Sequence, residues 1–145
     1  MNVQKYIPLL ARTAIAVIFL HSGVGKISNF AGTQEQIAGA GLPLAPLVTV
    51  FTILFLFVGS ISLIVGYKAR IGAGLLLAFL IPATLVFHNF IADPIQLGQF
   101  MKNLAIIGGL LMVTAYGSGP LSLDYRATAP ISAPSSSRYS EESVR

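Results

Sequence analysis

The chain has 145 residues, of which 54% are hydrophobic and 10% are charged, and its formal net charge is +4. A soluble domain carries about 25% charged residues, so this chain lacks the polar surface that water requires and must place its exterior in lipid. The absence of cysteine excludes disulfides and thiolate metal sites. The basic residues flank the apolar runs, as residues that set membrane topology do, and this distribution argues against a nucleic acid partner.

The first apolar run covers residues 6–23 and is predicted to span the membrane. It could be mistaken for a secretory signal. However, Arg12 interrupts it, and residues 21–26 do not have the small-residue spacing of a cleavage site, so we expect the segment to be retained. A polar connection over residues 29–41 follows it.

Three further runs are predicted to span the membrane. Residues 44–65 carry no charge and, at ~1.5 Å per residue, cross the ~30 Å hydrocarbon layer. A basic turn at residues 66–70 is too short to cross anything, so the next run, residues 71–92, must return antiparallel. Pro82 in that run is expected to kink the helix, which a bundle tolerates. Residues 98–116 form the weakest run.

These runs predict an all-α membrane protein, a bundle of four transmembrane helices over residues 1–126. The Ser- and Pro-rich residues 127–145 are expected to form a disordered tail. Four spans put both termini on one side, which also receives most of the Lys and Arg residues near helix ends. The positive-inside rule therefore favours cytoplasmic termini. The basic residues on that side are Lys5, Lys68, Arg70 and Arg126, against Lys26 and Lys102 on the other.

The predicted topology collects polar residues at the outer end of the bundle. The first and third helices both run outward and end there, and the fourth helix begins there. This topology predicts the depth of the polar residues in the membrane but not their contacts. The residues at that end are His21, Ser22, Lys26, His88, Asn89, Lys102 and Asn103. No Asp or Glu lies within an apolar run, which argues against a proton antiporter, since such transporters use a buried carboxylate.

Arg12 lies about a third of the way into the first helix, at the inner end of the bundle. Insertion scales put the cost of a central arginine at roughly +2.5 to +3.5 kcal/mol, so its side chain should face the bundle interior or snorkel inward. Two interpretations are equally open. Arg12 is either a counter-ion for an anionic ligand or quinone oxygen, or a structural residue that pins helix ends through carbonyls or Asp124.

His21 and His88 reach the same end of the bundle. Imidazoles on facing helices can ligate haem or a metal, or hydrogen-bond a quinone carbonyl. Two interfacial histidines paired with backbone or water are a far commoner arrangement than a haem site, because two histidines form a weak pattern. The sequence therefore predicts no metal site, and quinone is favoured over haem as a cofactor.

Several ordered blocks between residues 9 and 124 resemble the DoxX family, in particular its small bacterial inner-membrane members. The resemblance implies four transmembrane helices in the plasma membrane and a redox context, since the family name comes from a subunit associated with a terminal quinol oxidase and thiosulfate:quinone oxidoreduction. Eukaryotic relatives are regarded as cargo receptors. The blocks are residues 9–12 (LLAR), 19–26 (FLHSGVGK), 59–70 (GSISLIVGYKAR), 88–90 (HNF), 102–109 (KNLAIIGG) and 119–124 (GPLSLD).

The chain departs from the family at one position in the second helix. Many members carry a glutamate shortly before the glycine pair that corresponds to Gly59-Ser60, whereas residues 55–58 here contain no acid. The resemblance therefore does not carry over a mechanism that relies on that carboxylate. Family membership also transfers a fold more readily than a reaction.

Two hypotheses for function follow. The first is an accessory or anchoring subunit of a membrane oxidoreductase system, with quinone or quinol binding and a soluble redox protein or a second copy as partner. The second is a non-enzymatic membrane scaffold or small-molecule carrier, in which the same residues shape a cavity. Both use the candidate contacts Arg12, His21, His88, Asn89, Lys102 and Asn103.

Overall fold

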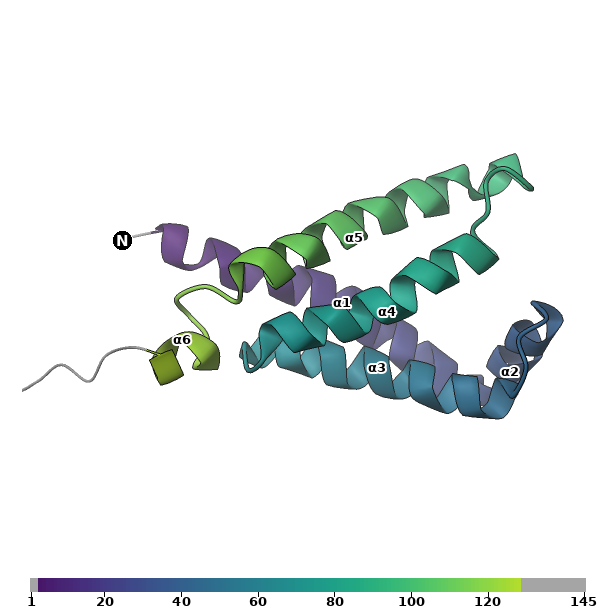
Figure 1. The fold of residues 1–145 in the computed structure, drawn as a ribbon, viewed down its shortest axis with the longest axis horizontal. Helices are drawn as coiled ribbons and strands as arrows, with labels where there is room; N and C mark the ends of the chain where they lie inside the picture. Colours follow the sequence, from purple (N-terminus) through teal and green to yellow (C-terminus); the bar gives the residue numbers. More distant parts are fainter. Residues whose placement is uncertain (1–2, 129–145) are drawn as a thin grey trace, which may run out of the picture.

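The computed structural model describes residues 3–128, and within that range every regular element is a helix (Figure 1). Four stretches are long and apolar enough to cross a membrane, which confirms the predicted all-α, four-span architecture. The helices are α1 (Ile7–Ser28), α2 (Phe30–Gly39), α3 (Ala45–Val65), α4 (Ala69–Phe87), α5 (Leu97–Tyr116) and α6 (Leu123–Thr128), with 3-10 turns at Val3–Lys5 and Pro94–Gln96.

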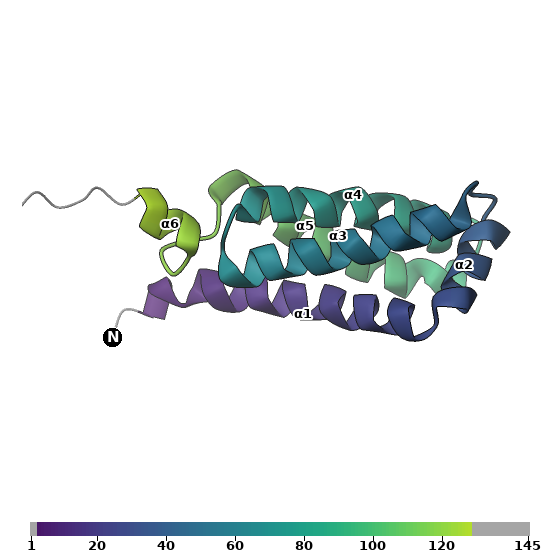
Figure 2. The same ribbon diagram turned by 90° about the horizontal axis from the view of Figure 1, so that it is seen from below.

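The four long helices lie along the long axis of the molecule (Figures 1 and 2). The start of α1, the α3–α4 turn and α6 lie at one end, which we call the terminal end. Helix α2 and the α4–α5 connection lie at the other, the distal end. The two ends of the described chain thus share one end of the bundle, as the four-span topology requires. The assignment of that end to the cytoplasm stays a prediction.

Small residues bring α3 and α4 into close contact. A Cβ added at Gly59 would lie 2.6 Å from Cγ of Leu76 and 3.0 Å from the Gly72 carbonyl oxygen. Close backbone approach of this kind is how membrane helices gain packing energy, since lipid supplies no hydrophobic force between them. The buried hydrophobic cluster comprises Ala16, Phe19, Leu56, Leu63, Ala73, Leu76, Leu80 and Leu110.

Two predictions for the first span and the connection that follows it are wrong. Helix α1 continues to Ser28 rather than ending near residue 23, because Gly23 packs in the helix against the Phe57 ring instead of ending it. The predicted polar connection contains helix α2, whose N-terminus is capped by the Asn29 side chain through an N–H from Gly32 at 3.2 Å.

The predicted third span is also too long at its distal end. Helix α4 passes through Pro82 but ends at Phe87, five residues before the expected boundary. The Asn89 side chain accepts a hydrogen bond from the Ile91 N–H at 3.1 Å, an Asx-type turn that competes with helix. At the other end of the chain, α6 reaches Thr128, two residues into the predicted tail, and residues 129–145 lie outside the described residues.

Candidate functional site

The α4–α5 connection at the distal end holds two of the predicted contacts. Nδ1 of His88 lies 2.9 Å from Oε1 of Gln96, and Nε2 of Gln96 donates to the Asp93 carboxylate at 3.4 Å. Asn89 uses its side-chain oxygen on the local turn. His88 is therefore oriented by Gln96, a residue that the sequence did not single out.

Asn103 is the most buried of the predicted distal contacts, with a side chain that is 6% exposed. Its Nδ2 donates to Oγ1 of Thr84 at 3.0 Å, and that hydroxyl donates in turn to the Leu80 carbonyl at 2.7 Å. Among the described residues, no other hydrogen bond is recorded for the Asn103 side chain, although an amide offers two donors and an acceptor. Asn103 therefore keeps hydrogen-bonding capacity for a ligand.

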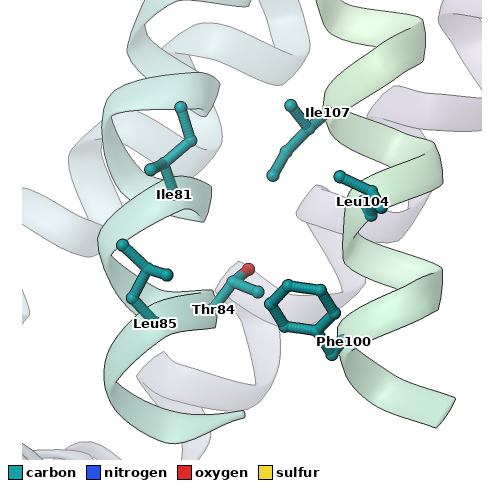
Figure 3. Close-up of a pocket in the computed structure, with 6 residues that line it drawn as sticks. All are labelled: Ile81, Thr84, Leu85, Phe100, Leu104 and Ile107. Carbon is teal, nitrogen blue, oxygen red and sulfur yellow. The ribbon is translucent and has the colours of Figure 1, made fainter. Parts of the chain in front are cut away.

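Thr84 also lines a cavity of about 160 Å³ between α4 and α5, which we call the α4–α5 groove (Figure 3). Figure 3 shows Thr84 pointing between the two helices toward Phe100. Three lining residues, Ile81, Leu85 and Leu104, are themselves exposed, so the groove opens to the outside of the bundle at the depth of lipid. The complete lining is Ile81, Thr84, Leu85, Phe100, Leu104 and Ile107.

His88 is the residue that follows α4 and lies four positions beyond Thr84. The backbone N–H of His88 still donates to the Thr84 carbonyl at 3.0 Å. We call the groove, together with the neighbouring residues Asn103 and His88, the distal strip. The spacing of Thr84 and His88 in the sequence was the signal that could have identified Thr84.

The structure does not bring His21 and Lys102 into this strip. His21 is exposed on α1, and Nζ of Lys102 donates to Oε1 of Gln99 at 2.5 Å on the exposed side of α5. Both lie in the distal half of the bundle, as their depth predicted. A role for either residue in ligand binding stays a prediction.

Arg12 lies in the terminal half, apart from the other candidates, with a side chain that is 1% exposed. Its Nη1 donates to the Ser118 carbonyl at 2.9 Å, and its Nη2 donates to the Leu121 carbonyl. Arg12 therefore ties α1 to the segment between α5 and α6. These are the contacts expected of a structural arginine, the second of the two interpretations of this residue.

Asp124 completes this arrangement, which we call the terminal clamp (Arg12, Gly66, Ser118, Leu121, Ser122 and Asp124). Its carboxylate accepts the backbone N–H groups of Lys68 at 2.7 Å and Ala69 at 3.0 Å, at the start of α4. The Asp124 N–H donates to the Gly66 carbonyl at 2.9 Å. A carboxylate at a helix N-terminus satisfies donors that the helix cannot pair internally.

The pKa of Asp124 reflects these contacts. Burial alone would raise the pKa, but hydrogen bonds from the Ala69 and Lys68 N–H groups and from the Ser118 hydroxyl, together with the charge of Arg12, lower it below its ordinary value. A carboxyl group whose pKa is lower in the folded state contributes stability above its unfolded pKa, about 3.9. That contribution disappears as the pH falls through the folded-state pKa.

We therefore expect two effects of Asp124→Asn. The variant should be less stable than wild type at neutral pH, and its stability should fall less as the pH is lowered. The asparagine amide cannot accept both N–H groups, and it does not titrate. Thermal unfolding of detergent-solubilised wild type and variant, followed from about pH 7 down to about pH 3, measures both effects. Equal acid sensitivity in the two proteins would contradict a role for the Asp124 carboxylate in the loss of stability at low pH.

Comparisons with known proteins point to one family. The model of the DoxX family matches residues 7–89. Inner membrane protein YqjF of Escherichia coli is 35% identical over 118 residues, which cover 80% of this chain and 88% of that protein. Inner membrane protein YphA of the same organism is 28% identical over 123 residues, covering 81% and 88%.

A more distant similarity reaches a eukaryotic protein. The ER-derived vesicles protein ERV29 of Saccharomyces cerevisiae is 37% identical over 79 residues, which cover 51% of this chain and 26% of that protein. No solved structure matches the chain.

Proposed function

The chain belongs to the DoxX family, and we propose that it is an accessory or anchoring subunit of a membrane oxidoreductase system that binds a quinone or quinol at the α4–α5 groove. It is a multi-pass inner-membrane protein: it has four apolar spans, and two relatives are inner membrane proteins. The redox role and the ligand are the proposed part.

One observation supports the ligand: a buried amide with spare hydrogen-bonding capacity sits beside an apolar groove. Nδ2 of Asn103 holds the Thr84 hydroxyl at 3.0 Å, and Thr84 lines the groove. An amide N–H can donate to a quinone carbonyl, and an amide oxygen can accept from a quinol hydroxyl, so one side chain serves both redox forms. Asn103 itself does not line the groove, so a ligand ring would reach its amide past the Thr84 side chain.

The lining of the groove suits the ring of such a ligand, while its volume of about 160 Å³ is below the ~300–1,000 Å³ of whole small-molecule sites. Its walls are apolar, and Phe100 offers an aromatic surface against which a planar ring can stack. Small-molecule sites commonly combine apolar walls with a few polar groups that set orientation. Because the groove opens toward lipid, an isoprenoid tail could remain in the bilayer while the ring enters.

The accessory role follows from the side chains available for electron transfer. The chain has no cysteine and only two histidines, which leaves few ligands for a redox centre of its own. Electrons would therefore come from or pass to a partner protein. In the alternative, a scaffold or carrier, the groove would hold an apolar molecule that undergoes no redox change.

The test is a binding measurement on protein in lipid nanodiscs with a short-chain ubiquinone as the probe. We expect Asn103→Leu to weaken retention about tenfold, the effect of losing ~1.4 kcal/mol. Met101→Leu is the matched control, because it changes an exposed residue of the same helix that does not line the groove and should bind as wild type does.

Two outcomes would count against the proposal. If Asn103→Leu retains the ubiquinone as well as wild type, the α4–α5 groove is not its site. If wild type itself retains none while a non-redox apolar molecule co-purifies with it, the scaffold or carrier interpretation replaces the redox one.

A further inference from the structure

A second groove lies at the terminal end of the bundle, between α3 and α4. It has a volume of about 400 Å³, within the ~300–1,000 Å³ range of small-molecule sites. Its walls are apolar, and Lys68 in the α3–α4 turn stands at its end. We call it the α3–α4 groove; the lining residues used below are Val58, Ile61, Val65, Lys68, Ile71 and Leu75.

We propose that this groove binds an anionic phospholipid of the leaflet on the terminal side, with an acyl chain between α3 and α4 and the headgroup phosphate paired with the Lys68 ammonium. The site is distinct from the groove proposed above for a quinone, which lies between α4 and α5 toward the distal end, and does not depend on it.

The position of Lys68 is fixed by its backbone. Its φ of +48° is left-handed, which is unusual for a residue with a side chain. The Ser62 hydroxyl lies within hydrogen-bonding distance of two carbonyls, those of Tyr67 at 2.7 Å and Lys68 at 3.2 Å. The Lys68 N–H donates to the Asp124 carboxylate at 2.7 Å. The turn is therefore held from both sides, and the Lys68 side chain is presented from a rigid base.

The Lys68 ammonium itself is available for a ligand. It lies 5.7 Å from the centre of the Tyr67 ring, a cation–π distance, and no ion pair is recorded for it within residues 3–128. The carboxylate of the clamp, Asp124, accepts backbone N–H groups and the Ser118 hydroxyl. A phosphate could therefore pair with Lys68 without displacing an existing partner.

The surroundings of the groove identify a lipid as its occupant. Ile61 and Ile71 line it from α3 and α4 and are 54% and 61% exposed, on helices that span the membrane. From Val65 to Val58 the groove runs about 10 Å along α3 at ~1.5 Å per residue. That length is about a third of the ~30 Å hydrocarbon layer, so an acyl chain that starts at the turn can follow it.

The charge of the turn selects an anionic headgroup. Lys68 and Arg70 lie within three residues, and Nη2 of Arg70 donates to the Ala115 carbonyl at 3.3 Å, which leaves Lys68 as the group at the groove. Basic residues next to a membrane are attracted to anionic lipids by ~1 kcal/mol each. We expect this preference to appear as an approximately fivefold enrichment.

The experiment is native mass spectrometry of the full chain released from nanodiscs that contain equal amounts of phosphatidylglycerol and phosphatidylcholine. Wild type should retain one phosphatidylglycerol in preference to phosphatidylcholine. Lys68→Gln should lower that preference about fivefold. Lys102→Gln, which removes the same charge at the distal end, should not. Equal retention of the two lipids by wild type, or an unchanged preference in Lys68→Gln, would overturn the proposal.

A second pair of variants tests the groove independently of the charge. Ile61→Trp places a large ring at the groove, whereas Leu54→Trp places it on an exposed part of the same helix that does not line the groove. We expect only Ile61→Trp to reduce the retained phospholipid. Equal retention in both variants, or a quinone rather than a phospholipid at this site in wild type, would contradict an acyl-chain site.

Discussion

Arg12→Leu is expected to destabilise the folded protein by about 2–6 kcal/mol, since it leaves two carbonyls without a donor at ~1–3 kcal/mol each. The substitution keeps an apolar stem but leaves the carbonyls of Ser118 and Leu121 without their donors. The segment that joins α5 to α6 would then lose its attachment to α1. Unfolding in mixed micelles with increasing dodecyl sulfate measures the change in the free energy of unfolding.

Arg12→Lys is the control that separates charge from geometry. An ammonium keeps the positive charge, but it does not have the planar fork that reaches two carbonyls at once. We expect it to recover only part of the lost stability. If Arg12→Leu instead folds as stably as wild type and loses ubiquinone retention, Arg12 is a ligand contact, which was the first interpretation of this residue.

The four spans could be predicted because hydropathy reports contact with lipid and does not depend on how helices pack. The boundaries at Ser28 and Phe87 could not, because they depend on local contacts. Gly23 packs against the Phe57 ring and remains helical, and helix α2 begins at a side-chain cap on Asn29. Neither contact leaves a signal in a hydropathy average.

The sequence predicted how far along the bundle each candidate residue lies, but not which face of its helix it occupies. Topology correctly placed His21 and Asn103 in the distal half, but only Asn103 faces the bundle interior. The buried residues of α1 are Arg12, Ala16, Phe19 and Gly23. His21 is nine residues from Arg12, which at ~3.6 residues per turn puts it on the opposite face. Taking Arg12 as the residue that marks the interior face of α1 would have predicted that His21 faces outward.

Only some contacts of the terminal clamp could be predicted from the sequence. A contact of Arg12 with carbonyls or with Asp124 was one of the two interpretations, and the carbonyl contacts are present. The cap that Asp124 provides for α4 was not predicted, because it joins residues more than fifty positions apart. A separation of that size follows from packing, which local sequence patterns do not encode.

Gly66→Ala is expected to be the most damaging single substitution of a small residue in the clamp. Gly66 has a φ of +70°, where a side chain costs about 1–2 kcal/mol. The added Cβ would also clash with Nη1 of Arg12 and lie 2.5 Å from Cβ of Ser122. Overpacking a buried site costs about 1–3 kcal/mol more, so the sum is about 2–5 kcal/mol.

Alanine substitutions at two further glycines separate the cost of a left-handed backbone from the cost of overpacking. Gly41 also has a left-handed backbone, with a φ of +78°, but nothing lies within 4 Å of an added Cβ, so Gly41→Ala carries the backbone cost alone. Gly74 lies inside α4 with equally open space, so Gly74→Ala should be neutral or stabilising by up to about 1 kcal/mol.

The same dodecyl sulfate titration on the three alanine variants should order their stabilities, with Gly74→Ala highest, Gly41→Ala intermediate and Gly66→Ala lowest. The difference between the last two measures the rigidity of the Arg12 side chain. If Gly66→Ala loses no more than Gly41→Ala, Arg12 moves aside without cost. The clamp would then be too pliable to explain the burial of a guanidinium group in a membrane helix, and a ligand role for Arg12 would gain support.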